Sequence, residues 1–165
     1  MQSWIPWIVI IVVLAMVVGP IAMLKPNKRQ QRIALLRQQA NAQHISVRLE
    51  PEPDGLVAAG QTPQLVAYYS IHIDSKKLPH WRLQKTSFAH EIHIAQYWQW
   101  QGGESLALTP AKLSALELLL ASVPKDVLAI GCDKTGIGVM WGESKQVPLT
   151  EIQALLESLK SFVQT

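Results

Sequence analysis

The sequence predicts an α+β fold in which a single N-terminal transmembrane helix precedes a small domain with a mainly antiparallel sheet covered by helices. A long uncharged apolar stretch opens the chain, segments of alternating hydrophobicity follow from Ile45, and segments of helical periodicity come late. Strands that precede most helices and are joined by short turns favour an antiparallel sheet. We therefore divide the chain into a transmembrane anchor (1–24), a basic juxtamembrane helix or linker (25–44) and an α+β domain (45–165).

The apolar stretch runs from Trp4 to Leu24 and contains no charged residue. At about 1.5 Å per helical residue it reaches roughly the 30 Å of a bilayer's hydrocarbon core. A cleaved signal fits less well, because Met1–Ser3 carries no basic side chain and no small-residue cleavage site follows. The sequence predicts a retained membrane anchor.

Basic residues lie only on the C-terminal side of this anchor. Because Lys and Arg near a span stay in the cytoplasm, the N-terminus is expected outside a bacterial inner membrane and residues 25–165 inside. Tryptophans favour the outer interface, and basic side chains meet anionic headgroups. The expected membrane-interface residues are Trp4, Trp7, Lys25, Lys28, Arg29 and Arg32.

The distribution of charge argues against a nucleic-acid partner. From Glu50 onward the chain carries nine Lys or Arg and twelve Asp or Glu, so the excess of positive charge belongs to the membrane-proximal segment. Phosphate binding requires basic residues gathered on the folded domain. The single cysteine, Cys132, permits no intramolecular disulfide and suits a reducing compartment.

Periodicity places the elements of the domain. Strands are expected at 45–50, 64–73, 80–85, 92–100, 127–132 and 137–141, and helices at 28–43, 110–123 and from Thr150 onward. Thr109–Pro110 is typical of a helix start, Pro124 of a helix end, and Thr150 with Gln153 of a capping box. The residues expected to be buried are Ile45, Val47, Leu49, Ile71, Trp81, Trp98, Leu116, Ile130, Val139, Leu155 and Leu159.

The segment His90–His93 (HEIH) invites comparison with a zinc site. Zinc proteases place two histidines four apart on a helix, whereas these are three apart in a segment that reads as a strand. Positions three apart in a strand face opposite sides, and His44, His72 and His80 could join them only through the tertiary fold. We expect no metal and no cofactor here.

Asp133–Gly136 (DKTG) resembles the phosphorylation motif of P-type transport ATPases, in which the aspartate accepts a phosphoryl group. Ile137 replaces that family's next threonine, and a strand follows the motif. Asp and Gly are also common in tight turns, so we interpret the segment as a turn between two strands. Cys132 has no histidine base near it in the sequence, and the glycines here precede no helix that could hold a phosphate.

Tyr97–Trp100 (YWQW) could form an aromatic binding platform, although large aromatics on a sheet more commonly pack in the core. We interpret them as core residues.

The N-terminal region resembles that of the YajC family, the small accessory subunit of the bacterial Sec preprotein translocase. The shared features are an apolar span, then a proline within a basic cluster, here Lys25–Arg32 (KPNKRQQR), and then a short helix. The resemblance implies an inner-membrane protein without catalytic activity that associates with a translocase. The sequence thus favours a non-catalytic binding or scaffold subunit with a membrane-protein partner. The alternative is a membrane-tethered enzyme that uses His90, Glu91, His93 or Asp133.

Overall fold

The computed structural model describes the backbone of most of the chain and, within the first helix, the side chains from Pro6 to Met16. The described residues are 4–23, 26–53, 56–57, 61–74, 78–87, 94–95, 97–101 and 108–164. They form two compact units, residues 1–35 and 36–165, and each is described by itself.

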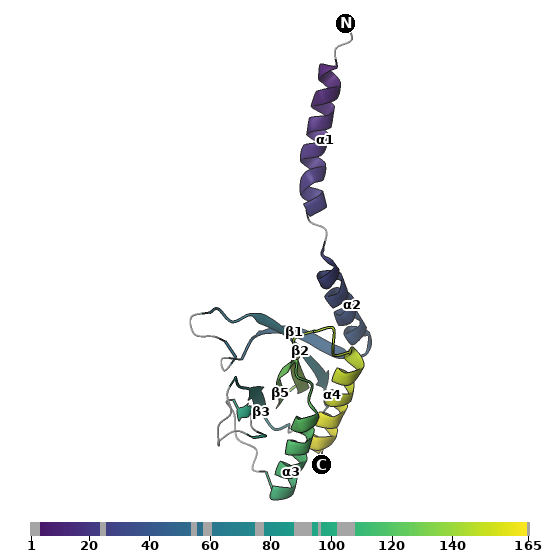
Figure 1. The fold of residues 1–165 in the computed structure, drawn as a ribbon. Coiled ribbons are helices and arrows are strands. Elements are labelled where there is room, and N and C mark those ends of the chain that lie inside the picture. Colours follow the sequence, from purple (N-terminus) through teal and green to yellow (C-terminus); the bar gives the residue numbers. More distant parts are fainter. Residues whose placement is uncertain are drawn as a thin grey trace. The chain divides into compact units, whose positions relative to one another are not determined.

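The α+β prediction is confirmed: the described residues form four helices and a six-stranded antiparallel sheet, in the predicted order along the chain (Figure 1). The helices are α1 (Ile5–Met23), α2 (Lys28–Ala42), α3 (Pro110–Ser122) and α4 (Leu149–Gln164). The strands are β1 (Ile45–Pro51), β2 (Leu65–His72), β3 (Trp81–Lys85), β4 (Trp98–Trp100), β5 (Val127–Asp133) and β6 (Gly136–Trp141).

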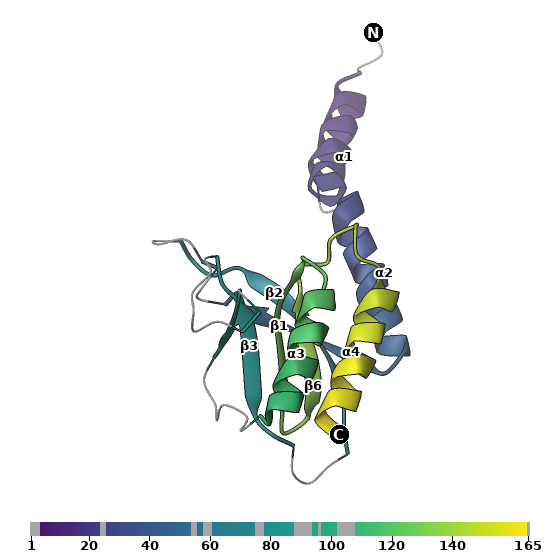
Figure 2. The ribbon, with the colours of Figure 1, turned by 60° about the horizontal axis from the view of Figure 1, so that its bottom comes forward.

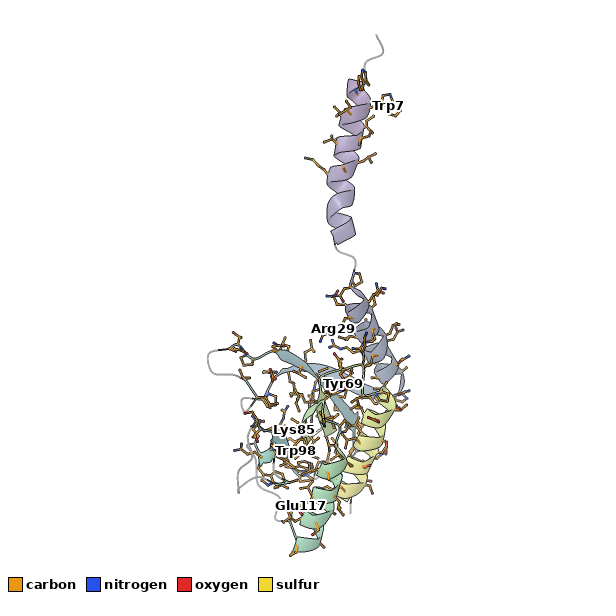
Figure 3. All side chains as sticks on the ribbon, in the orientation of Figure 1. Trp7, Arg29, Tyr69, Lys85, Trp98 and Glu117 are labelled. Carbon is orange, nitrogen blue, oxygen red and sulfur yellow. The ribbon has the colours of Figure 1, made fainter. Side chains whose placement is uncertain are left out.

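The part of helix α1 whose side chains are described, Pro6–Met16, carries apolar side chains around the helix (Figure 3). Each described side chain from Pro6 to Met16 is exposed, with Trp7 at 69% and Met16 at 74%. Among the described residues, no helix is at once long enough and apolar enough to cross a membrane.

Helix α2 begins where Asn27 and Gln30 bond reciprocally. The Gln30 N–H donates to Asn27 Oδ1 at 2.8 Å, and the Asn27 N–H donates to Gln30 Oε1 at 2.9 Å. This is a capping box, which satisfies donors that the first helical turn leaves unpaired. The C-terminal part of α2 belongs to the second unit, where Ala40 is fully buried and Leu36 packs against the core.

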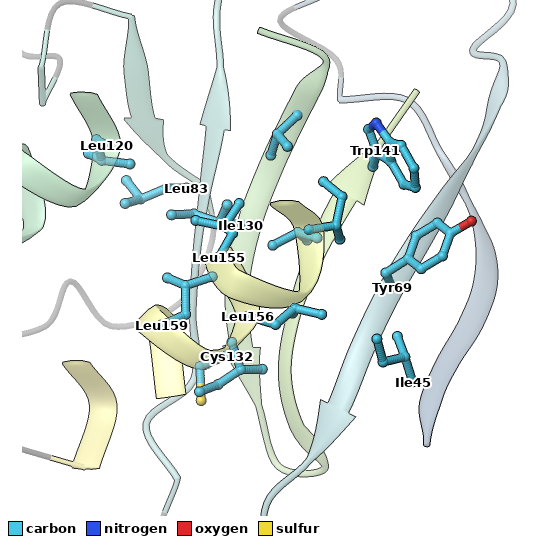
Figure 4. Packing of buried hydrophobic residues seen from close by; sticks show 14 of the residues in the cluster. Ile45, Tyr69, Leu83, Leu120, Ile130, Cys132, Trp141, Leu155, Leu156 and Leu159 are labelled. Atoms are coloured by element: carbon cyan, nitrogen blue, oxygen red, sulfur yellow. The ribbon is translucent and has the colours of Figure 1, made fainter. Parts of the chain in front are cut away.

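The sheet has the strand order β1-β2-β6-β5-β3-β4, with all neighbours antiparallel. Helices α3 and α4 lie across one face of it (Figure 2). Alternate strand residues, including Tyr69, Ile130 and Trp141, point into the core beneath these helices and belong to the same buried cluster as Leu156 and Leu159 of α4 (Figure 4). As predicted, α3 begins at Pro110, and the Lys112 N–H donates to Thr109 Oγ1 at 3.4 Å.

The predicted strand 92–100 is wrong. The chain turns within it, because Ile94 and Trp98 exchange both backbone hydrogen bonds, at 2.7 and 3.0 Å, and Ala95 adopts a φ of 47°. Among the residues of this range that the structure describes, Trp98–Trp100 alone forms a strand. Alternating hydrophobicity suggested one strand because this turn contains neither Gly nor Pro.

Two smaller predictions also need correction. Leu49 is 51% exposed although its position in the alternation predicted burial, because it lies on the end strand of the sheet. Helix α4 begins at Leu149, so Thr150 lies inside the helix and does not cap it. Val47 and Ile71 are partly buried, and the other residues predicted to be buried are in the core.

Candidate functional site

The face of the sheet opposite α3 and α4 holds the candidate site. Alternation along β2 sends Tyr69 into the main core and Tyr68 to this opposite face, where Tyr68 packs in a separate small cluster with Ala129 and Met140. Gly131 and Gly138 face each other across β5 and β6, and their missing side chains leave room on the sheet surface. The Tyr68 ring occupies part of that room, since a Cβ at Gly138 would overlap it.

Two arginines lie over the Tyr68 ring. The Cζ atoms of Arg48 and Arg82 are each 5.3 Å from the ring centroid, within the range of cation–π attraction. Arg48 comes from β1, directly opposite Tyr68, and Arg82 comes from β3, directly opposite Gly131. Three strands therefore supply one stack of side chains.

Two carboxylates neutralise these arginines. Glu50 Oε2 accepts from Arg82 Nη2 at 2.9 Å, and Glu50 Oε1 lies 3.5 Å from Arg48 Nη2. Asp133 Oδ2 lies 3.5 Å from the same nitrogen of Arg48. We call Arg48, Glu50, Tyr68, Arg82 and Asp133 the arginine–tyrosine cluster; its formal charges balance.

A cavity of about 380 Å³ opens over this cluster. Besides the cluster, its walls include His80, Trp81, Gln101, Gly131 and Cys132. It is mixed in character, with guanidinium, carboxylate and aromatic surfaces together, which suits binding of a polar or peptide-like group.

Two side chains that could act as nucleophiles occur at this part of the sheet: Tyr68 lies on the face that bears the cavity, whereas the Cys132 side chain belongs to the main core. Burial, and secondarily the charge of Asp133, raises the pKa of the Cys132 thiol to about 11. Burial raises the pKa of the Tyr68 hydroxyl as well, although Arg82 opposes the shift. A nucleophilic cysteine needs a lowered pKa, whereas the pKa of the buried Cys132 thiol is raised.

Asp133 serves a turn, as the sequence predicted. Its Oδ1 accepts hydrogen bonds from the Thr135 N–H at 2.7 Å, the Thr135 hydroxyl at 2.5 Å and the Gly136 N–H at 3.2 Å. Burial alone would raise the pKa of this carboxyl, but the bonds from Thr135 and Gly136 and the charge of Arg48 lower it. The DKTG segment is therefore the hairpin between β5 and β6, capped by its own aspartate.

A second ionic group ties α2 to the sheet. Glu143 follows β6, is 5% exposed and has a φ of 54°. Arg37 donates to both of its oxygens, from Nε at 2.7 Å and from Nη2 at 2.8 Å, and the Tyr69 hydroxyl donates to Oε1 at 2.7 Å. Burial, together with the bond to Glu143, raises the pKa of Tyr69. Sequence reasoning missed this group, because neither Arg37 nor Glu143 belongs to a local motif.

Among the residues that it describes, the structure does not bring together the histidines that the sequence analysis considered as metal ligands. His90, Glu91 and His93 lie outside the described residues, as does Lys25. His72 Nδ1 is 2.7 Å from the Thr135 carbonyl oxygen, whereas His80 lines the cavity. Within the described ranges, no three His, Cys, Asp or Glu side chains gather as metal ligands would.

The remaining candidates divide between core and surface. Trp98 is 3% exposed, which confirms its place in the core, and Lys85 Nζ lies 5.2 Å from its ring centroid (Figure 3). Trp100 is partly buried and stands edge-on to Trp81, with the ring centroids 6.0 Å apart. The predicted interface residues Trp4, Trp7, Lys28 and Arg29 are exposed, and Arg32 is partly buried.

Comparison with protein families gives a match in the N-terminal region. Residues 2–31 match a family described as a protein of unknown function (DUF2897). No curated protein and no solved structure matches the chain. The matched residues include the apolar stretch and most of the basic cluster.

Proposed function

We propose that this chain is a single-pass protein of the bacterial inner membrane whose cytoplasmic domain acts as a non-catalytic binding or scaffold subunit of a membrane complex. One observation carries the proposal: every described side chain of α1 from Pro6 to Met16 is exposed, and all of them are apolar. A large exposed apolar surface marks a site of membrane or protein interaction. The absence of charge from Trp4 to Leu24 favours the membrane.

The orientation follows from the basic cluster. Lys28 and Arg29 are exposed at the start of α2, where they can meet anionic headgroups. We expect residues 25–165 in the cytoplasm and Trp4 and Trp7 at the outer interface.

Reporter fusions and extraction test the location. Alkaline phosphatase fused after Thr165 should be inactive, and a fluorescent protein at the same point should be bright. The chain should remain in the membrane pellet after alkaline carbonate extraction. The opposite pair of reporter results would overturn the orientation, and release by carbonate would overturn the anchor.

The binding role rests on the mixed cavity over the arginine–tyrosine cluster and on the juxtamembrane helix. The resemblance to the YajC family points to the protein-export translocase as the complex. Photocrosslinking from Gln38, which is exposed on α2, in native membranes should recover a membrane-protein partner. Recovery of lipid alone would refute a partner at this helix.

Exchanging basic residues separates a lipid role from a protein role. Replacing Arg29 and Arg32 by Lys keeps the charge but removes the planar fork that only Arg provides. If the segment serves lipid, this variant inserts and behaves as wild type. If it binds a protein, insertion is normal and the crosslinked partner is lost.

The enzyme alternative depends on His90, Glu91, His93 or Asp133. Asp133 bonds within the β5–β6 turn, and the other three residues lie outside the described ranges. Metal analysis of the purified chain tests it. Stoichiometric zinc that disappears in His90→Ala and His93→Ala would favour the enzyme and overturn the non-catalytic proposal.

A further inference from the structure

The geometry of the sheet edge leads us to propose a homodimer in which β1 pairs antiparallel with β1 of a second copy, centred on Leu49. Strand β1 is the first in the strand order, so β2 is its one neighbour in the described sheet. The inference goes beyond the proposed function, and it holds or fails independently of the membrane anchor.

The register between β1 and β2 shows which backbone groups face outward. The Glu52 N–H donates to the Gln64 carbonyl at 2.8 Å, so Glu52 directs its backbone groups toward β2. In an antiparallel pair this direction alternates, so Glu50 and Arg48 also bond toward β2. The N–H and C=O groups of Val47 and Leu49 consequently point to the open edge.

Pro51 agrees with this assignment. Pro51 lies two residues after Leu49, so its backbone groups face the same way as those of Leu49. The N–H that proline lacks would therefore have pointed away from β2. In a pair centred on Leu49, the two Leu49 residues exchange both backbone bonds. Each Val47 N–H donates to the Pro51 carbonyl of the second copy, which needs no donor from the proline.

The side chains favour the same centre. Leu49 is 51% exposed although it belongs to the apolar side of β1, and self-pairing would cover it with an identical side chain. On the other side of the strand, this register places Arg48 opposite Glu50 of the second copy, twice by symmetry. Opposite charges in such cross-strand pairs are stabilising.

Other registers of β1–β1 pairing give less favourable cross-strand contacts. Centring on Arg48 or on Glu50 sets like charges directly opposite each other, which is destabilising. Centring on Val47 places Leu49 opposite Ile45 of the second copy, but Ile45 is only 3% exposed and is already buried in the core of its own chain. This register also pairs Arg48 with the uncharged Ser46. The Leu49 register alone among these joins the exposed leucine and the complementary charges.

Cysteine crosslinking of the full-length chain tests the register. In a backbone-bonded pair the two Leu49 Cα atoms would be about 5.5 Å apart, within the roughly 4.4–6.8 Å range of disulfides. Leu49→Cys should therefore form a disulfide-linked dimer on mild oxidation. The control is Ser46→Cys, on the same strand and also exposed, whose copies would lie about 20 Å apart at ~3.4 Å per residue. Cys132 is 2% exposed and gives little background.

A dimer with Leu49→Cys and none with Ser46→Cys is the expected result. Failure of Leu49→Cys to crosslink would overturn the proposal. Equal crosslinking at both positions would overturn it too, because random collision would then explain both.

Exchanging the charges of Arg48 and Glu50 gives a second test. Its positive result, restored crosslinking on co-expression, cannot be produced by misfolding of either variant. In the Leu49→Cys background, Arg48→Glu sets like negative charges across the interface, and Glu50→Arg sets like positive charges. Each variant alone should crosslink several-fold less than its parent. Co-expression of the two should restore crosslinking, because both cross-strand pairs of the mixed dimer again join an acidic and a basic side chain. Recovery would support the charge pairing, because mixing cannot repair a copy that fails to fold. Circular dichroism of each variant alone should match that of its parent, and with both variants folded, no recovery in the mixture would overturn the charge pairing.

Discussion

Removing the Arg37 guanidinium should destabilise the domain far more than removing a surface charge does. Glu143 is 5% exposed, and Arg37 supplies two of the hydrogen bonds to its carboxylate. Arg37→Met keeps most of the aliphatic stem and a good helix former, but it takes the guanidinium away from a buried carboxylate. Breaking a buried ion pair from one side costs about 3–5 kcal/mol.

Two features of the structure place the expected loss of stability in Arg37→Met at the lower end of that range. The Arg37 side chain is 32% exposed, so part of the pair is already solvated. The Tyr69 hydroxyl, which donates to Glu143 at 2.7 Å, is left in place by the change. We therefore expect a loss of about 3 kcal/mol, which is a large part of the roughly 5–15 kcal/mol that stabilises a typical domain.

Urea unfolding of the full-length chain in detergent, followed by circular dichroism, measures the loss. The matched control is Lys160→Met, which breaks an exposed pair with Glu157 at 3.7 Å and should change stability by no more than about 0.5 kcal/mol. Adding Glu143→Gln to Arg37→Met should recover stability, because the amide still accepts from Tyr69 and the buried carboxylate charge is gone. Equal effects of Arg37→Met and Lys160→Met, or a double variant less stable than Arg37→Met, would refute the reasoning.

Two further predictions concern Gly138 and Asp133, on the face of the sheet opposite α3 and α4, and a third concerns Cys132, in the main core. Gly138→Ala should cost about 1–3 kcal/mol by overpacking against the Tyr68 ring, whereas Gly142→Ala, whose Cβ would lie 3.6 Å from its nearest neighbour, should unfold at the wild-type temperature. The pKa of Asp133 is lowered in the folded chain, so the ionised carboxylate stabilises the fold above its unfolded pKa of about 3.9, and this stabilisation is lost as the pH falls. Urea unfolding should therefore show a smaller loss of stability between pH 5 and pH 3 for Asp133→Asn than for wild type. Cys132, with a pKa raised to about 11, should react with a maleimide only after denaturation, and rapid labelling of the native chain would contradict its burial.

Local sequence patterns determined the order and type of the elements. Thr109 and Pro110 mark the start of α3 by the chemistry of their own side chains, and the apolar periodicity of α4 needs no distant partner to be recognised. The turn at Asp133–Gly136 was likewise predictable, because its hydrogen bonds run between residues two or three positions apart. Prediction failed between Ile94 and Trp98, where the turn carries no residue that marks it.

Tertiary structure alone decided the candidate site. Arg37 bonds Glu143 across 106 positions, and Arg48 approaches Asp133 across 85, so no spacing rule connects them. The strand order was equally hidden, because β6 lies between β2 and β5 through long-range backbone pairing that every antiparallel strand can offer. That order leaves β1 at the edge, where Leu49, apolar by pattern, is 51% exposed although Ile45 of the same strand is buried. Periodicity identifies which side chains share a face, but neighbours in space depend on how the whole sheet assembles.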